Sequence, residues 1–131
     1  ITAIVKVKSN MHSGIFQPMQ LASVEALNLG DEWYASVNET YAKRRKLVEA
    51  IMHKLNCTFD AGQTGLFVWG KIPATYASGE LLTEEILHKA HVFITPGMVF
   101  GEQGNDYIRI SLCANEQMLR KALERIKGIY E

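Results

Sequence analysis

The segment at residues 91–114, HVFITPGMVFGEQGNDYIRISLCA, decides the architecture of this chain. It holds a short apolar run, a Pro-Gly turn, an aromatic-Gly stop, a polar loop and a strand at 107–112 with one arginine. Successive side chains of a strand point to opposite faces, so Ile108 and Ile110 share one face and Arg109 lies on the other. The planar guanidinium of Arg109 suits a carboxylate or phosphate, which it can bind through two parallel hydrogen bonds. On the strand alone, a solvated arginine on an outer sheet face is the more common outcome.

The composition indicates an ordinary globular domain. The chain has 131 residues, of which 47% are hydrophobic and 21% charged, and this length is enough to bury a sizeable core. Lys+Arg 14 against Asp+Glu 14 leaves no net charge, so electrostatics give no reason to expect a nucleic acid or an anionic membrane as partner. No apolar run approaches the roughly 20 residues that span a bilayer. The first residues, ITAIVKVKSN, have neither a signal-peptide core nor an initiator methionine. We therefore expect a cytoplasmic protein, or a piece of one whose natural start lies upstream.

The cysteines and histidines predict neither a disulfide framework nor a metal site. Cys57 and Cys113 are far apart and outside any C-x-x-C arrangement, which favours buried thiols. His88 and His91 have a spacing that would let them share a metal, but no third ligand stands at a suitable distance along the sequence.

The first part of the chain predicts helices. Residues 1–8 alternate loosely and fit either an edge strand or the end of a helix. Pro18 suits the first turn of a helix that stops near Gly30. Asp31 is a good N-cap for a much longer helix that runs to about residue 55. The basic run at 43–46 in that helix is typical of a solvated face.

The second part predicts a small α+β layer in which helices cover one face of a sheet. Asn56 can end the long helix in a left-handed turn, and Asn115 can cap a final amphipathic helix. Between them the pattern predicts a strand within 65–73, a helix at 81–90 and strands at 92–95 and 107–112.

Two motifs in order resemble the C-terminal signature of class I/II aminotransferases. These motifs are TPGMVFG at 95–101 and YIRIS at 107–111. The family consists of pyridoxal-phosphate enzymes of fold type I, in which a PG-x-x-FG loop precedes the strand whose arginine binds the α-carboxylate of the substrate. The resemblance implies that role for Arg109.

The resemblance covers essentially the whole chain and implies a division into three parts. Residues 1–29 would be the tail of the large cofactor-binding domain, 30–56 the long interdomain helix, and 57–131 the C-terminal small domain. The likeness is strongest in 65–112.

Further site residues follow from the same resemblance. Gly65-Leu66-Phe67 looks like the family's Gly-Met-Phe strand start, which implies that Phe67 lies near the bound substrate, although plain core packing also fits an aromatic strand residue. Ser9-Asn10 resembles a pair at the family's dimer interface that approaches the partner subunit's cofactor phosphate or substrate. It thereby implies a homodimer, although a turn or cap would use the same pair.

The lysine that carries pyridoxal phosphate as a Schiff base in this family is not evident in the chain. That lysine typically stands in a Ser-Lys context with Gly-x-Arg some residues later. Val7 precedes Lys8, no arginine follows Gly14, and the other lysines are in no such context either. We therefore expect no catalytic residue in this chain, a cofactor lysine upstream of Ile1, and no activity from the fragment alone.

The resemblance implies a parent enzyme that moves an amino group between an amino acid and a 2-keto acid. Two alternatives stay open: a non-catalytic α+β module that uses Arg109 to hold a small anionic ligand, and a pyridoxal-phosphate β-lyase or decarboxylating relative. Arg109 does not distinguish among substrates such as aspartate, aromatic amino acids and diaminopimelate.

Overall fold

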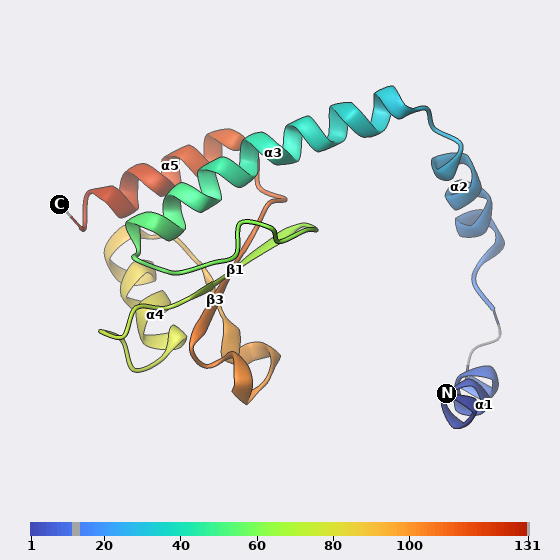
Figure 1. Ribbon diagram of the computed structural model, residues 1–131, viewed down its shortest axis with the longest axis horizontal. Coiled ribbons are helices and arrows are strands. Elements are labelled where there is room, and N and C mark those ends of the chain that lie inside the picture. Colours follow the sequence, from blue (N-terminus) through green and yellow to red (C-terminus); the bar gives the residue numbers. More distant parts are fainter. Residues whose placement is uncertain (12–13, 131) are drawn as a thin grey trace. The chain divides into compact units, whose positions relative to one another are not determined.

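The computed structural model describes residues 1–11 and 14–130, and the chain divides after Val37 into two compact units. Figure 1 shows the elements of both units, coloured along the sequence. The division falls inside the helix α3 (Asp31–Lys54). No described helix combines the length and the apolar character that crossing a bilayer would need.

The first unit contains two short helices and the start of α3. Helix α1 (Thr2–Met11) takes up the loosely alternating residues at the start of the chain, so the helical alternative holds there. Helix α2 (Gln17–Leu27) has Pro18 in its first turn, as predicted, and Asn28 caps its end. Neither helix buries a single side chain, so packing within this unit contributes little to its stability.

The second unit combines α3 with a small sheet and two further helices. After α3 come the strand β1 (Phe67–Lys71), helix α4 (Gly79–Ala90), the very short strand β2 (Thr95–Pro96) and strand β3 (Tyr107–Ser111). Two 3-10 turns, η1 (Gly97–Phe100) and η2 (Glu102–Gly104), connect β2 to β3, and helix α5 (Glu116–Lys127) ends the unit. This arrangement confirms the predicted α+β class.

The three strands form an antiparallel sheet in the order β1-β3-β2. Trp69 pairs with Arg109 across β1 and β3, and Thr95 pairs with Arg109 from the other side. One face of β1 and β3 is buried and carries Val68, Ile108 and Ile110. The alternation of strand side chains therefore puts Arg109 on the opposite face.

The core lies on the buried face of the sheet and draws on α3, α4 and α5. One continuous cluster of apolar side chains joins these elements. Its fully buried members include Val48, Met52, Leu82, Ile86, Ile108 and Ile126. The helices thus cover one sheet face, as the sequence pattern predicted, and Arg109 lies on the other face.

Local signals at the helix ends agree with the sequence. Asn115 accepts a hydrogen bond from the Met118 N–H at 2.9 Å and so caps α5. Asn56 has φ of 55°, the left-handed turn expected after α3. Ser78 caps α4 by accepting from the Leu81 N–H at 3.2 Å, and this cap starts the helix two residues earlier than predicted.

Two predictions need correction. The strand expected at 92–95 is reduced to Thr95–Pro96, because residues 91–94 and the part of β3 after Arg109 line a cavity and do not pair with each other.

The basic run at 43–46 is solvated only in part. Lys43 and Lys46 are exposed, whereas Arg44 and Arg45 are half-buried and donate to the carbonyl oxygens of Leu112 and Gly65.

Candidate functional site

The outer face of the sheet brings aromatic side chains to Arg109. Phe67 lies on β1 diagonally across from Arg109, and Trp69 is its direct cross-strand partner. Both positions lie within reach of a long side chain on the neighbouring strand. The Cζ atom of Arg109 lies 4.1 Å from the centroid of the Phe67 ring.

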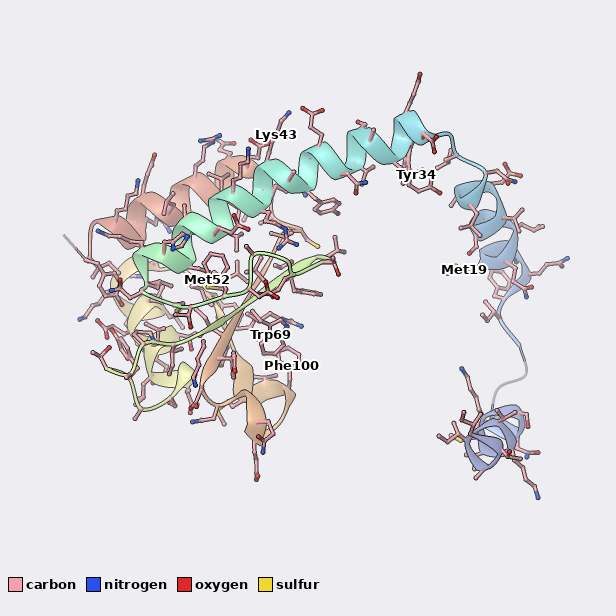
Figure 2. The ribbon with its side chains drawn as sticks, in the orientation of Figure 1. Met19, Tyr34, Lys43, Met52, Trp69 and Phe100 are labelled. Atoms are coloured by element: carbon pink, nitrogen blue, oxygen red, sulfur yellow. The ribbon has the colours of Figure 1, made fainter. Side chains whose placement is uncertain are left out.

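The 3-10 turn η1 supplies a second ring. The Phe100 centroid lies 4.0 Å from Arg109 Cζ, and the Phe100 ring meets the Trp69 ring edge-on with centroids 5.3 Å apart and an interplanar angle of 70°. Figure 2 shows Trp69 and Phe100 lying together on this face of the sheet. Residues 67, 69 and 100 therefore form an aromatic cluster around one guanidinium.

Glycines in the connection between β2 and β3 allow this placement. Gly97 packs so tightly that a Cβ atom there would overlap the carbonyl oxygen of Gly104. Gly101 follows Phe100 with φ of 123° and ψ of 163°, a backbone conformation that only glycine adopts readily. The PG-x-x-FG spacing therefore encodes a compact loop that presents Phe100 toward β3.

The Arg109 side chain is half-buried, with its donors available for a ligand. Within residues 1–11 and 14–130 its guanidinium has no hydrogen-bonding or ion-pair partner, and its recorded contacts are with the rings of Phe67 and Phe100. A ring beside a guanidinium attracts the cation through its π face. The planar fork of N–H groups on a guanidinium matches the two oxygens of a carboxylate.

A cavity of about 570 Å³ lies between β3 and α5 and includes Arg109 in its lining. Residues 91–95 form one wall, and Lys121 and Arg125 of α5 add positive charge to another. Phe67, Trp69 and Phe100 are not among its lining residues. Arg109 therefore contacts the aromatic cluster and also lines this largely apolar cavity.

Comparison with known proteins identifies the family. The model of the family described as aminotransferase class I and II matches residues 1–126. The chain belongs to this family of pyridoxal-phosphate-dependent enzymes.

Relatives of this aminotransferase chain are longer than it is. It is 38% identical over 129 residues to an LL-diaminopimelate aminotransferase from Oleidesulfovibrio alaskensis, and the match covers 98% of the chain and 33% of the relative. It also resembles an aminotransferase structure from Staphylococcus aureus (TM-score 0.74, 29% identity, 99% of this chain and 35% of that one). An aromatic aminotransferase from Pyrococcus horikoshii matches with a TM-score of 0.71 and 28% identity over 84% of this chain and 30% of that one. The chain thus spans about a third of the length of these relatives.

The structure brings together only some of the site residues predicted for this aminotransferase chain. Phe67 and Arg109 are in direct contact. Ser9 and Asn10 belong to the other unit, near the end of α1, where both side chains donate to the Lys6 carbonyl oxygen at 3.0 Å and 2.7 Å. Both residues are exposed.

The sequence analysis assigned no role to Phe100 or Trp69. The signal that could have identified Phe100 is its place in the PG-x-x-FG motif, between the two glycines that fix the loop. The cross-strand register that places Trp69 beside Arg109 cannot be read from the sequence of either strand alone.

The described lysines do not fit the position that carries pyridoxal phosphate. A lysine that forms a Schiff base must lose its proton, so its pKa has to fall. Hydrogen bonds from Lys43 to Glu39 and from Lys89 to Glu85 instead raise the pKa of both ammonium groups. Lys54 donates to the Tyr130 carbonyl oxygen at 3.0 Å, and the remaining lysines lack the Ser-Lys context. None of the described lysines therefore fits the position of the cofactor lysine.

Proposed function

We propose that the chain is the C-terminal part of a pyridoxal-phosphate-dependent aminotransferase that moves an amino group between an amino acid and a 2-keto acid. The observation that carries this proposal is the Arg109 guanidinium, which rests against two aromatic rings and has no acceptor among the described residues. The bound cofactor would supply the electron-withdrawing ring on which amino-group transfer depends. This chain would supply the contact that binds and orients the substrate.

In this proposal Arg109 binds the α-carboxylate of the amino acid through two parallel hydrogen bonds. A bidentate pair fixes both the distance and the plane of the carboxylate. Because the α-carbon is directly attached, its substituents are then oriented as well, and orientation of this kind contributes several kcal/mol to catalysis. Phe67, whose ring is partly exposed beside the guanidinium, would form part of the wall of the same site.

The remaining assignments concern the complete protein. We propose that residues 1–29 belong to the large cofactor-binding domain, that 30–56 form the interdomain helix, and that 57–131 form the small domain. We also propose a homodimer in which Ser9 and Asn10 face the partner's cofactor or substrate. Their exposed side chains are compatible with such a contact. A cytoplasmic location fits the two free cysteines, Cys57 and Cys113.

The names of the relatives give a first substrate to test. Several relatives are named LL-diaminopimelate aminotransferase, with identities from 33% to 38%. LL-diaminopimelate carries an α-carboxylate at each end, so either end satisfies the proposed contact with Arg109. We therefore propose this amino acid, with 2-oxoglutarate as a generic acceptor, as the first pair to assay.

Substitution of Arg109 in the full-length enzyme tests the proposal. Because Arg109→Ala removes two charge-assisted hydrogen bonds, we expect kcat/KM to fall about 100- to 1,000-fold for every amino-acid substrate. Arg109→Lys should recover little of this loss, since an ammonium is a point charge without the planar fork. Steady-state kinetics with at least two amino acids measure both effects.

The matched control is Arg120→Ala on α5. The Arg120 side chain is 63% exposed and forms only a loose pair with Glu116, so this change should leave kcat/KM unaltered. An Arg109→Ala enzyme with unchanged kcat/KM would rule out the assigned role.

A further inference from the structure

The aromatic cluster around Arg109 extends beyond the residue that the family signature predicts to lie near substrate. Phe100 contacts the guanidinium at 4.0 Å, and Trp69 in turn contacts Phe100 edge-on at 5.3 Å. The order of contacts is therefore Trp69 to Phe100 to Arg109, with Phe67 as the second ring on the guanidinium.

Core packing does not account for the position of Phe100. Its side chain is 50% exposed, and the neighbouring Val99 of the same turn is 66% exposed. A ring that served only to bury apolar surface would have a better place on the inner face of the sheet, where side chains are fully covered. The loop instead uses two special glycines to hold Phe100 over a charged group on the outer face.

An arginine without a hydrogen-bonded partner needs something else to hold it still. A long side chain loses rotamer freedom when it binds a ligand, and this loss weakens binding. Rings stacked on the guanidinium remove part of that freedom beforehand, attract the cation through their π faces and exclude water from it. The donor edge is then preset for an incoming carboxylate.

We propose that Phe100 and Trp69 are positioning residues for the carboxylate site: Phe100 fixes the plane of the Arg109 guanidinium, and Trp69 fixes Phe100. Neither residue needs to touch the substrate. The inference rests on the proposed role of Arg109, and it adds two residues and a physical reason for the aromatic position of the PG-x-x-FG motif.

Equilibrium binding to the full-length holoenzyme tests the inference without relying on turnover. The probe is pimelate, which has the carbon skeleton and both carboxylates of diaminopimelate but no amino group to transfer. Propionate serves in parallel as a probe with a single carboxylate. Calorimetry should show that Phe100→Leu weakens binding about three- to tenfold, the range expected when a stacked ring is lost from a cation. Trp69→Leu should weaken it by a smaller factor, because Trp69 acts through Phe100.

A double-substitution cycle separates positioning from a general structural effect. In an Arg109→Ala background, Phe100→Leu should change pimelate binding by less than about twofold, because the group that it positions is gone. An equal loss in both backgrounds would overturn the inference, since Phe100 would then act on the site without Arg109.

Conservative and control variants complete the design. Phe100→Tyr keeps a ring at this position and should bind pimelate like the unaltered enzyme. Val99→Ala changes a neighbouring residue that is 66% exposed and should have no effect. Thermal unfolding of each variant checks that it is folded. If Phe100→Leu does not fold, Trp69→Phe in both backgrounds makes the same comparison.

The outcomes distinguish this inference from the proposed function. If Arg109→Ala weakens pimelate binding and Phe100→Leu and Trp69→Leu do not, the positioning role is wrong and the carboxylate role of Arg109 stands. If Arg109→Ala leaves the binding of both probes unchanged, the carboxylate role fails, and the positioning role fails with it.

Discussion

Three arginines of the second unit differ in what their guanidinium groups contact. Arg44 and Arg45 donate to the carbonyl oxygens of Leu112 and Gly65 at 3.2 Å and 3.1 Å. Arg44 also has its Cζ atom 5.4 Å from the centroid of the Tyr41 ring. Arg109, by contrast, has two rings against its guanidinium and no acceptor among the described residues. A half-buried cation in such a setting costs free energy unless an anion completes it. This contrast supports the proposed role of Arg109 in binding a carboxylate.

The two cysteines also differ from each other, in burial and in the reactivity that burial implies. Burial raises the pKa of the Cys57 thiol to about 11, while Cys113 is exposed. The prediction of buried thiols is therefore confirmed for Cys57 and wrong for Cys113. Only the thiolate reacts with alkylating agents. At about pH 8 the Cys57 thiolate is then roughly a thousandth of the thiol population. We therefore expect iodoacetamide to label Cys113 at least about 100-fold faster than Cys57, as followed by mass spectrometry of peptides.

The sign of the pH effect gives a second check on Cys57. Because its pKa is raised in the folded state, the thiol stays protonated until the pH approaches about 11, so labelling should accelerate with pH over that range. Unfolding in concentrated urea serves as the control and should remove the difference between the two cysteines. Equal labelling rates in the folded chain would show that Cys57 is accessible.

At the scale of elements, α3 is fastened to the sheet by the middle of its basic run. Arg44 and Arg45 connect α3 to the residue that follows β3 and to a residue just before β1. Each guanidinium also buries one nitrogen that has no hydrogen-bond partner among the described residues, Nε of Arg44 and Nη1 of Arg45, which offsets part of the gain. Both side chains therefore orient α3 more than they stabilise it.

These hydrogen bonds predict that substitutions within the basic run will change the stability of the chain by different amounts. Arg44→Ala and Arg45→Ala should each lower the free energy of unfolding of the chain by about 1 kcal/mol, the range for a hydrogen bond reduced by the unpartnered nitrogen. Lys43→Ala is the matched control. Its ion pair with Glu39 is exposed, so no measurable change is expected. Urea unfolding measures all three, and equal values for the three variants would contradict the assignment.

Sequence patterns predicted most elements because those elements have local causes. Pro18, Asn56 and Asn115 act within one or two turns of the chain, and the structure has a helix end at each of them. The sequence could not show that Arg44 and Arg45 reach carbonyl oxygens 68 and 20 residues away. The shortened β2 has the same explanation, since pairing depends on which segment of β3 is available to it.

At the scale of the whole molecule, the two units differ in how much apolar surface each of them buries within itself. The second unit has a continuous apolar core, whereas α1 and α2 bury no side chain. These helices, together with the two residues that precede α2, instead expose a series of large apolar residues: Ile4, Val5, Val7, Met11, Ile15, Phe16, Met19, Leu21, Val24 and Leu27. Apolar surface of this extent is typical of a region that is covered by other protein. The sequence pattern left residues 1–8 open between a strand and a helix and predicted a helix from Pro18, and the structure has a helix in both places.

This difference predicts how the isolated chain behaves in solution. We expect residues 1–131 to self-associate at micromolar concentration, because the exposed apolar side chains of α1 and α2 bury one another. Residues 31–131 should associate far less and should still unfold cooperatively, since they retain the whole core. Light scattering coupled to size exclusion gives the molar mass of each, and circular dichroism follows unfolding. Replacing Val5, Val7, Leu21 and Val24 with serine in the longer chain is the matched control and should reduce its association. A monodisperse monomer of residues 1–131 would show that the first 30 residues need no covering partner, and the proposed tail of a larger domain would then lose its physical support.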